Sequence, residues 1–207
     1  MAAKTDTASL PKPELAGRMP IEEAIRIRRS MRSFSGGALS LPEVSQLLWA
    51  AQGTTGPDGL RAAPSAGALY PLTVYAVARA VTSLPAGNYR YAPSTHALDL
   101  VQSGDRLTDL TEAALNQDWI EGTAVALVIT ARYRRTTSKY GDRGARYVHM
   151  EVGHVAQNVY LQATALRLGT TVVGAFQDDR VKAVLSLPED EDPLCILPVG
   201  LPTTARR

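Results

Sequence analysis

The sequence predicts an α+β fold, and three observations lead to this class. With 207 residues, of which 45% are hydrophobic and 20% charged, the chain is long enough for one domain with a sizeable core. Short apolar runs typical of buried strands, such as AVALVITA at 124–131, are mixed with amphipathic segments, of which 144–168 is the longest. These segments show no regular βαβ alternation, which disfavours a parallel α/β fold.

The chain begins with a polar segment. Met1–Arg18 is interrupted by prolines, so we expect an N-terminal arm or a poorly ordered segment, followed by a single domain over residues 19–207. The segment lacks the apolar region of a signal peptide, and no run in the chain is long enough to span a bilayer. The one cysteine, Cys195, excludes an intrachain disulfide. We therefore expect a cytoplasmic protein with no membrane partner.

Helix and strand signals follow in mixed order. Ser40, Pro42 and Glu43 form the pattern of a capping box and predict a helix start. Gly169 follows the longest amphipathic segment and predicts a glycine C-cap. The expected helices cover residues 20–30, 40–52, 105–115, 144–168 and 178–185, and the expected strands cover 72–78, 88–91, 97–101, 124–131, 171–173 and 194–199.

Several common sites are absent from the sequence. It has no glycine-rich dinucleotide fingerprint, no P-loop and no G-x-S-x-G nucleophile elbow. Of the three histidines, His149 and His154 are five residues apart, roughly 140° around a helix, so they do not share a face. One cysteine cannot complete a zinc site, and we expect no metal.

Positive charge is concentrated in one stretch, although the net charge of the chain is only +2. Ile25–Phe34 reads IRIRRSMRSF and holds four arginines. Guanidinium groups bind phosphate oxygens through paired hydrogen bonds, and Ser30 adds a hydroxyl group. A solvated basic helix face and a nucleic-acid patch are the alternatives. Against nucleic acid, no aromatic residues interleave with the arginines and no basic stripe continues elsewhere.

Two further stretches could contact a flat ligand. APSAGALYP at Ala63–Pro71 is rich in small residues, which allow the backbone to approach a ligand closely. VGAF at Val173–Phe176 could present backbone amides at the end of a strand. Each stretch is a weak signal alone.

Together these stretches carry a family resemblance that covers residues 19–202. The chain resembles the nitroreductase superfamily of flavin proteins, in particular its SagB-type dehydrogenase or azoline-oxidase-like branch. The matching motifs are RRSMRSF at Arg28–Phe34, PSAGALYP at Pro64–Pro71, YVHMEVGHVAQNVYLQA at Tyr147–Ala163, VGAFQDDRVKAVLSLP at Val173–Pro188 and LPVGLP at Leu197–Pro202.

The resemblance implies a sandwich with a central, mostly antiparallel sheet flanked by helices. It also implies an intertwined homodimer with two FMN sites at the interface, each built from both chains. The residues that it assigns to FMN are Arg28, Arg29, Ser30, Arg32, Pro64, Ser65, Ala66, Gly67, Gln117, Gly174, Ala175 and Arg206.

Different parts of FMN are expected to meet different members of this set. Arg28 and Ser30 should contact the phosphate, with Arg29 alongside, and Arg32 should face the pyrimidine edge or the ribityl oxygens. Residues 64–67 should come from the other subunit. Residues 174–175 should lie near N5 and O4 of the ring. The basic tail at 206–207 departs from the position of the family's phosphate ligand, and Gln117, which precedes the apolar run at 124–131, is expected to touch the flavin.

The implied activity is two-electron transfer through flavin N5, from NAD(P)H to a nitro, quinone or similar small acceptor. The alternative enzyme is an azoline-to-azole dehydrogenase acting on a peptide, and a flavin binder without catalysis is a further rival. The chain lacks the extra N-terminal region often found in such peptide oxidases, which favours a stand-alone enzyme.

Two groups of residues keep more than one interpretation. Lys139, Tyr140 and Arg143 could line the substrate side or form an exposed basic loop. Tyr147, Glu151 and His154 could form a proton relay, or a satisfied polar network at a dimer interface.

Overall fold

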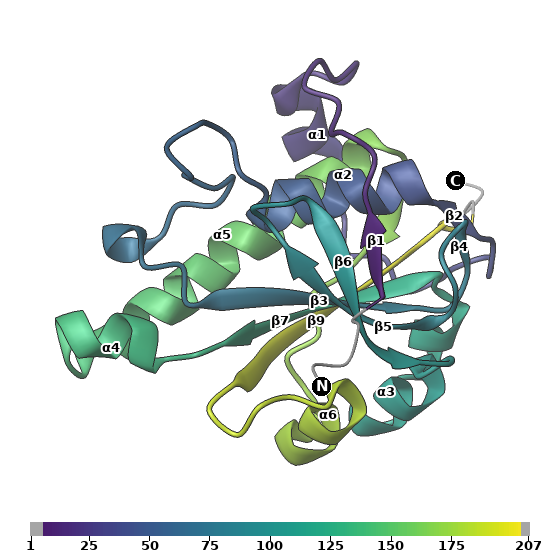
Figure 1. The fold of residues 1–207 in the computed structure, drawn as a ribbon. Coiled ribbons are helices and arrows are strands. Elements are labelled where there is room, and N and C mark those ends of the chain that lie inside the picture. The colour runs from purple at the N-terminus through teal and green to yellow at the C-terminus, as the bar shows by residue number, and fades with distance from the viewer. Residues whose placement is uncertain (1–5, 204–207) are drawn as a thin grey trace.

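The computed structural model describes residues 6–203, and its centre is a seven-stranded sheet in the order β1-β6-β5-β3-β7-β9-β8 (Figure 1). Every neighbouring pair in this sheet is antiparallel. A short parallel pair, β2 and β4, lies outside it. The strands are β1 (Thr7–Ser9), β2 (Leu39–Ser40), β3 (Leu72–Ala78), β4 (Val81–Thr82), β5 (Gly87–Ala92), β6 (Ala97–Ser103), β7 (Val125–Ala131), β8 (Gly169–Thr170) and β9 (Asp192–Gly200).

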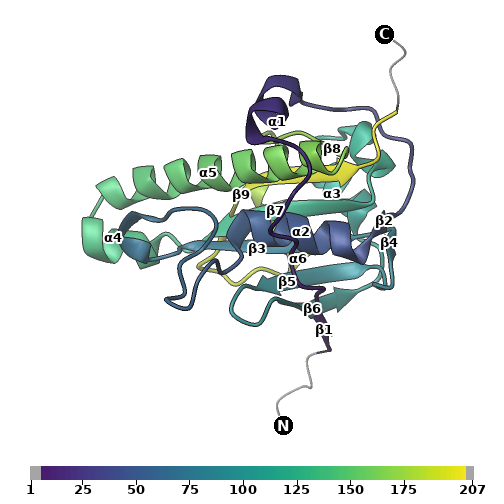
Figure 2. The ribbon, with the colours of Figure 1, turned by 90° about the horizontal axis from the view of Figure 1, so that it is seen from above.

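Helices cover both faces of the sheet. α2 and α5 lie on one face, and α3 and α6 lie on the other (Figures 1 and 2). The helices are α1 (Ile21–Ile27), α2 (Leu41–Gln52), α3 (Leu107–Ala113), α4 (Arg134–Tyr140), α5 (Arg143–Ala165) and α6 (Asp178–Leu185), with 3-10 turns η1 (Ala66–Ala68) and η2 (Asp118–Gly122). This is the α+β sandwich that the sequence predicts.

The central strands are apolar on both sides because each side packs against helices. In β3, Val74 and Ala76 belong to the core shared with α2 and α5, whereas Tyr75 and Val77 belong to the core shared with α3 and α6. All seven residues of β7 are buried. The prediction of a buried strand from the continuous apolar run AVALVITA is therefore confirmed. The structure shows that this strand is buried on both faces.

The expected capping box is present at α2. The Ser40 hydroxyl accepts from the Glu43 backbone N–H at 3.4 Å, and the Glu43 carboxylate accepts from the Ser40 N–H at 2.7 Å. The two contacts satisfy backbone donors at the start of the helix that have no partner within it.

The end of α5 differs from the prediction. The left-handed residue of its C-terminal motif is Arg167 at φ 60°, while Leu168 N–H bonds to Ala163 O in the Schellman pattern. The predicted glycine cap at Gly169 is wrong, because Gly169 begins β8 instead. A Cβ atom at Gly169 would lie 3.0 Å from both Met31 and Phe34, so close packing, not a cap, requires the glycine.

Three other boundaries differ from the sequence expectation. α1 ends at Ile27, before the expected Ser30. The expected strand at 171–173 is reduced to a single bridge between Val173 and Ile196. Within the expected N-terminal arm, residues 7–9 form strand β1 against β6.

No helix in residues 6–203 has the length and hydropathy needed to cross a bilayer.

Candidate functional site

Phe34 anchors the arginine-rich stretch to the domain. Its ring and Cβ come so close to Gly122, Gly169 and Gly200 that a Cβ on any of these glycines would lie 3.0–3.3 Å from it. Trp119 stacks on the ring at a centroid distance of 6.2 Å. These three glycines allow Phe34 to pack closely against the domain, and this packing fixes the end of the segment that carries the arginines.

Tyr160 of α5 connects the arginine stretch to the segment after β8. Its hydroxyl lies 3.0 Å from Ser30 Oγ, accepts from the Val172 N–H at 2.9 Å, and lies 3.3 Å from Thr171 Oγ1. The Arg28 guanidinium carbon is 5.0 Å from the ring centroid, a cation–π distance. Burial raises the pKa of Tyr160, but the hydrogen bonds and the Arg28 charge outweigh it and lower this pKa below its ordinary value.

Among the described residues, the arginines in this stretch have no acidic partner. Within residues 6–203, no carboxylate oxygen lies within 4.0 Å of a side-chain nitrogen of Arg28, Arg29 or Arg32. Arg29 donates to the backbone carbonyls of Arg26 and Arg28 at 3.1 and 2.7 Å, and so covers the end of α1. Arg32 is exposed. Local positive charge is thus left free to bind an anion.

The segment at 173–175 follows Val172, whose N–H donates to Tyr160, so the segment begins close to the arginine stretch. The N–H and C=O groups of Val173 both pair with Ile196 of β9, at 2.8 and 2.9 Å. Gly174 follows and is exposed, and a Cβ placed on it would meet nothing within 4 Å. The Gln117 side chain donates to Ala175 O at 3.2 Å. The structure therefore brings together Gln117 and Ala175, two of the residues assigned to FMN.

The small-residue loop at 64–67 is held by a separate polar network. Glu151 of α5 is 2% exposed and accepts from the Gln52 amide at 3.5 Å, and the Ser65 hydroxyl, which accepts from the Tyr70 N–H at 2.9 Å, acts to lower the pKa of Glu151. Arg61 donates to Gln52 at 2.9 Å and lies over the Tyr70 ring at 4.5 Å. Burial is the main cause that raises the pKa of Glu151. The network fixes the loop from its interior side.

The interpretation of Tyr147, Glu151 and His154 as one unit is only partly matched. Glu151 is buried in the polar network, but His154 is exposed and Tyr147 packs edge-on against Tyr140 at 5.1 Å. Within the described residues, no hydrogen bond joins Tyr147 or His154 to Glu151. The network interpretation therefore describes Glu151 better than the relay does.

The same loop reaches the residues expected on the substrate side. Gly67 has φ 62°, and a Cβ on it would lie 2.7 Å from Tyr140 Oη and 3.0 Å from Lys139 Nζ. Lys139 and Tyr140 form the end of α4, so this segment is a helix and not the exposed loop that was the alternative. Arg143 begins α5 and is exposed.

The expected cofactor residues therefore form two sets within one chain. The first set, Arg28–Arg32 with Gln117 and residues 174–175, lies near Tyr160, and the second, residues 64–67, lies near Tyr140 and Tyr147. Tyr160 lies 9 residues after Glu151, which interacts with Ser65, and 13 residues after Tyr147, or about 14 to 20 Å along α5. α4 and α1 lie toward opposite ends of α5 in Figure 2. One chain does not bring the two sets together. Arg206 lies outside the described residues.

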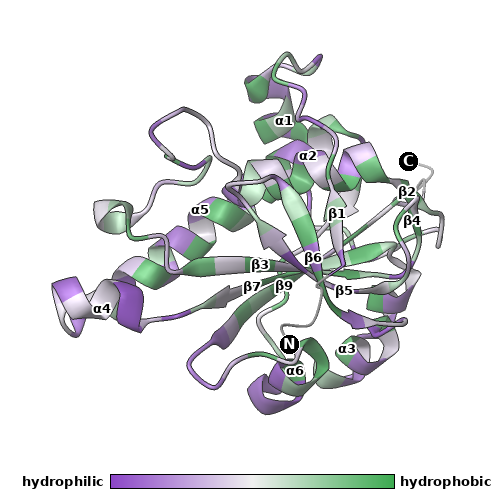
Figure 3. Cartoon of the chain, viewed as in Figure 1, coloured by the Kyte–Doolittle hydropathy of each residue, from purple (hydrophilic) through white to green (hydrophobic). Residues whose placement is uncertain are grey.

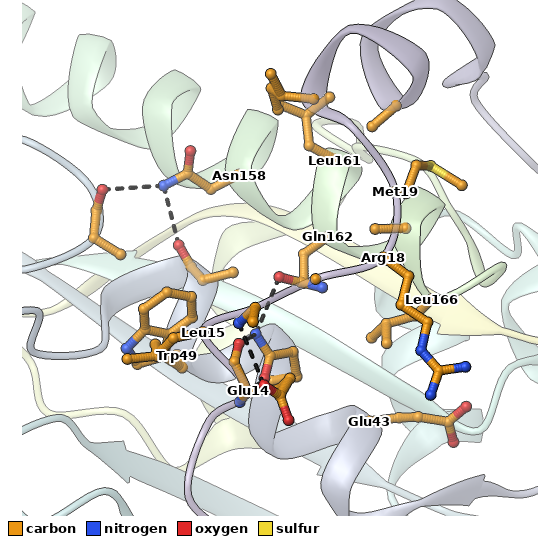
Figure 4. Close-up of a pocket in the computed structure, with 18 of the residues that line it drawn as sticks. Glu14, Leu15, Arg18, Met19, Glu43, Trp49, Asn158, Leu161, Gln162 and Leu166 are labelled. Atoms are coloured by element: carbon orange, nitrogen blue, oxygen red, sulfur yellow. Dashed lines mark hydrogen bonds between the residues drawn. The ribbon is translucent and has the colours of Figure 1, made fainter.

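A groove of about 950 Å³ lies between the segment 12–21, α2 and α5, and none of the expected cofactor residues lines it (Figure 4). Its amide side chains already have partners. The Gln46 amide donates to Glu14 O at 3.0 Å and Gln162 at 3.2 Å, and Asn158 donates to Ala50 O at 3.0 Å. No three His, Cys, Asp or Glu residues within 6–203 are grouped as a metal site.

Sequence reasoning missed Phe34, Tyr160 and Arg61 as residues that organise the site. Phe34 and Tyr160 fall inside the matched motifs but carry no charge, and only the fold shows what they contact. Arg61 stands in a loop, with no periodic pattern to mark it as half-buried.

Comparison with known proteins gives concordant results. The family model described as "Nitroreductase family" matches residues 25–201. A protein of Methanocaldococcus jannaschii named as a nitroreductase is 44% identical over 195 residues, covering 94% of this chain and 97% of that protein. A crystal structure from Ralstonia eutropha JMP134, likewise named a nitroreductase, superposes with a TM-score of 0.84 at 30% identity, covering 96% of this chain and 90% of that one.

A third similarity concerns the branch of the family. A chain of the E. coli microcin synthetase McbBCD, solved as a complex with truncated pro-MccB17, superposes with a TM-score of 0.73 at 25% identity. The match covers 92% of this chain and 76% of that one, and it supports the SagB-like branch. With the family model matching most of its length, the chain belongs to the nitroreductase family of oxidoreductases.

Proposed function

We propose that the protein is an FMN-dependent oxidoreductase that works as a homodimer and passes two electrons from NAD(P)H to a nitro, quinone or similar small acceptor. One observation carries the proposal: Tyr160 contacts Arg28, which has no carboxylate partner within residues 6–203, and also Val172, just before the exposed residues 174–175, whereas residues 64–67 lie toward the other end of α5. A second chain is needed to complete such a site.

The arginine end fits the phosphate of FMN. Arg28 and Ser30 supply a guanidinium group and a hydroxyl group, and neither the charge of Arg28 nor that of Arg32 is neutralised by a carboxylate within residues 6–203. A charge-assisted hydrogen bond to phosphate is among the stronger polar contacts in proteins. The residues present therefore match the group that the family implies.

The neighbouring residues fit the ring. Gly174 leaves open space where a flat ligand could approach the backbone, and Gln117 holds the carbonyl of Ala175 in place. Arg32 would supply positive charge on the pyrimidine side. Bound FMN would supply the two-electron chemistry through its N5 atom, and the chain's residues would orient the ring and keep water away.

Exposed apolar side chains support a second copy as the partner. Ile21 and Ile25 of α1 are 53% and 57% exposed, and Met150 of α5 is 54% exposed. A second copy packed along α5 would cover these exposed side chains. Pairing two copies through α5 would bring the arginine set of one chain toward residues 64–67 of the other.

The visible spectrum of the purified protein tests the proposal. We expect flavin absorbance, a dimer by light scattering, and bleaching of the flavin bands when NADH or NADPH is added without oxygen. Protein that is colourless and takes up no added FMN would refute it. Bound flavin that neither nicotinamide reduces would favour a non-catalytic binder.

Two arginine variants give a matched comparison. Arg28→Ala should weaken FMN retention more than it lowers the melting temperature, whereas Arg26→Ala, an exposed neighbour outside the motif, should retain FMN. If Arg28→Ala keeps its flavin and loses its melting transition, the cluster is structural. Steep salt-dependent binding to DNA, lost in Arg28→Ala, would instead indicate a nucleic-acid module.

A second candidate function is an azoline-to-azole dehydrogenase acting on a peptide. Two observations favour it: the similarity to a microcin synthetase chain, and the position of Tyr140 and Lys139 directly beside Gly67. Incubation with a thiazoline peptide under oxygen would decide the matter. Loss of two hydrogens from the ring, seen by mass spectrometry, would favour this function, and an unchanged mass would leave the small-acceptor enzyme.

A further inference from the structure

Tyr160 is the one side chain described above that touches both parts of the arginine end of the site. It contacts Ser30 and Arg28 on one side and Thr171 and Val172 on the other, although these segments are about 140 residues apart in the chain. Residues 171–172 lead directly into 174–175. A side chain in this place sets the position of the phosphate end relative to the ring end.

The hydroxyl of Tyr160 has its full set of hydrogen bonds. A phenolic hydroxyl carries one hydrogen to donate and accepts with its oxygen. The Val172 N–H donates to it at 2.9 Å, and the geometry has Tyr160 donate its own hydrogen to Thr171 Oγ1 at 3.3 Å. In this arrangement the contact with Ser30, 3.0 Å away, uses the hydrogen of Ser30.

An anion at Ser30 requires a different arrangement. Phosphate oxygens accept hydrogen bonds, so Ser30 has to turn its only hydrogen toward the phosphate. Tyr160 then has to turn its hydrogen from Thr171 to Ser30. Thr171 can in turn donate to Tyr160. The reversal moves no proton between residues; each hydroxyl only rotates.

We propose that Tyr160 is a positioning residue of the proposed FMN site, which relays hydrogen-bond donation from Thr171 through Ser30 to the phosphate. The inference rests on the proposed function and adds a residue to it. Hydroxyl groups arranged in one direction polarise one another, so each bond in such a chain is stronger than it would be alone. Tyr160 therefore acts on the phosphate through Ser30 and touches no reacting atom.

Comparison of FMN with riboflavin, which lacks the phosphate, tests the proposal. Dissociation constants are measured by flavin fluorescence for the full-length protein and for Tyr160→Phe, Ser30→Ala and their double variant. Tyr160→Phe keeps the ring beneath Arg28 and removes only the hydroxyl. Tyr89→Phe is the control. It also deletes a hydrogen bond donated by a tyrosine hydroxyl, in this case from Tyr89 of β5 to Pro85 O.

We expect Tyr160→Phe to weaken FMN binding about tenfold and to leave riboflavin binding within about twofold. The double variant should bind FMN no more weakly than Ser30→Ala, because both changes break the same relay. Tyr89→Phe should leave both constants unchanged. Equal weakening of FMN and riboflavin, or additive effects of the two single changes, would overturn the relay.

A second variant keeps the test decisive if Tyr160→Phe folds poorly. Thr171→Val preserves the shape of a buried side chain and leaves Ser30 as the remaining hydroxyl partner of Tyr160. FMN binding should weaken by a smaller factor than in Tyr160→Phe, because Thr171 is the first donor of the relay, and riboflavin binding should stay within about twofold. FMN binding that Thr171→Val leaves unchanged would overturn the stated direction of the relay. Unchanged protein that binds neither flavin would refute the proposed function, and this inference with it.

Discussion

Two variants that each fail to bind flavin should restore binding when their chains are mixed. Arg28→Ala removes the guanidinium group 5.0 Å above the Tyr160 ring. Gly67→Val places a branched side chain at φ 62°, with its Cβ 2.7 Å from Tyr140 Oη. The two positions lie in different sets, about 14 to 20 Å apart along α5, so each variant damages a different half of the proposed site.

The expected recovery follows from how the chains combine. If each site takes its arginine set from one chain and residues 64–67 from the other, a mixed dimer holds one site with both defects and one intact site. Random exchange makes half of the dimers mixed, so about one quarter of all sites should bind FMN. Absorbance of bound flavin per chain, after co-expression with two different affinity tags, measures this fraction.

Failure of the mixed chains to recover FMN binding would be equally informative. If both sets served the same site within one chain, every chain in the mixture would carry a defect and no binding would return. Mixed dimers captured through both tags that still hold no FMN would therefore refute the two-chain site. Each variant purified alone provides the baseline.

Three further predictions concern the fold. Ser40→Ala removes the capping box of α2 and should lower the free energy of unfolding by about 1 kcal/mol in urea titration. Burial raises the pKa of Cys195 to about 12, so a thiol reagent at pH 8 should react only after the protein unfolds; rapid reaction of folded protein would contradict this. Burial lowers the pKa of His96 below its ordinary 6.5, so the unfolded chain takes up a proton first and stability should fall as the pH drops below about 6.5. His96→Asn, which tolerates the φ of 48°, should flatten this slope, and parallel slopes for both proteins would refute the assignment.

The elements that the sequence predicted well are those whose pattern is set by burial. The long helix α5 follows from apolar periodicity and the buried strand β7 from a continuous apolar run, because each packs against the core. The start of α2 follows from local chemistry between Ser40 and Glu43. These signals need no knowledge of distant parts of the chain.

The missed elements depend on distant contacts. β1 reads TAS and has no apolar pattern, yet it pairs with β6 about 90 residues away. α4 reads RRTTSKY and is coloured hydrophilic over much of its length in Figure 3. Its one buried residue is Thr136. Gly169 was read as a cap because only the fold shows Phe34 packed against it. Tertiary contact, not local preference, decided each case.

The candidate site likewise combines residues that the sequence predicted with features that only the fold shows. The charged and small residues of the motifs were assigned together through the resemblance to the nitroreductase superfamily. Their division into two sets at different points along α5 follows only from the path of that helix. Tyr160 and Phe34, which hold the arginine stretch in place, had no signal of their own.

A glycine in the middle of α5 points to what completes the site. Gly153 is exposed, and a Cβ on it would meet nothing within 4 Å in this chain. Glycine inside a helix costs about 1 kcal/mol relative to alanine, and no contact within residues 6–203 requires a glycine here. Close approach of a second chain would require it, and Gly153 lies between Tyr147 and Tyr160, midway between the two sets.

Substitution of Gly153 should therefore separate folding from assembly. Gly153→Leu places a bulky side chain on the proposed contact surface while improving helix propensity, so the melting transition should persist while dimer and bound FMN are lost together. Gln157→Ala, one turn away on the same exposed side, is a milder control that should keep both. A Gly153→Leu protein that remains dimeric and retains FMN would show that α5 does not pair through this face, and the two sets would then need another route to meet.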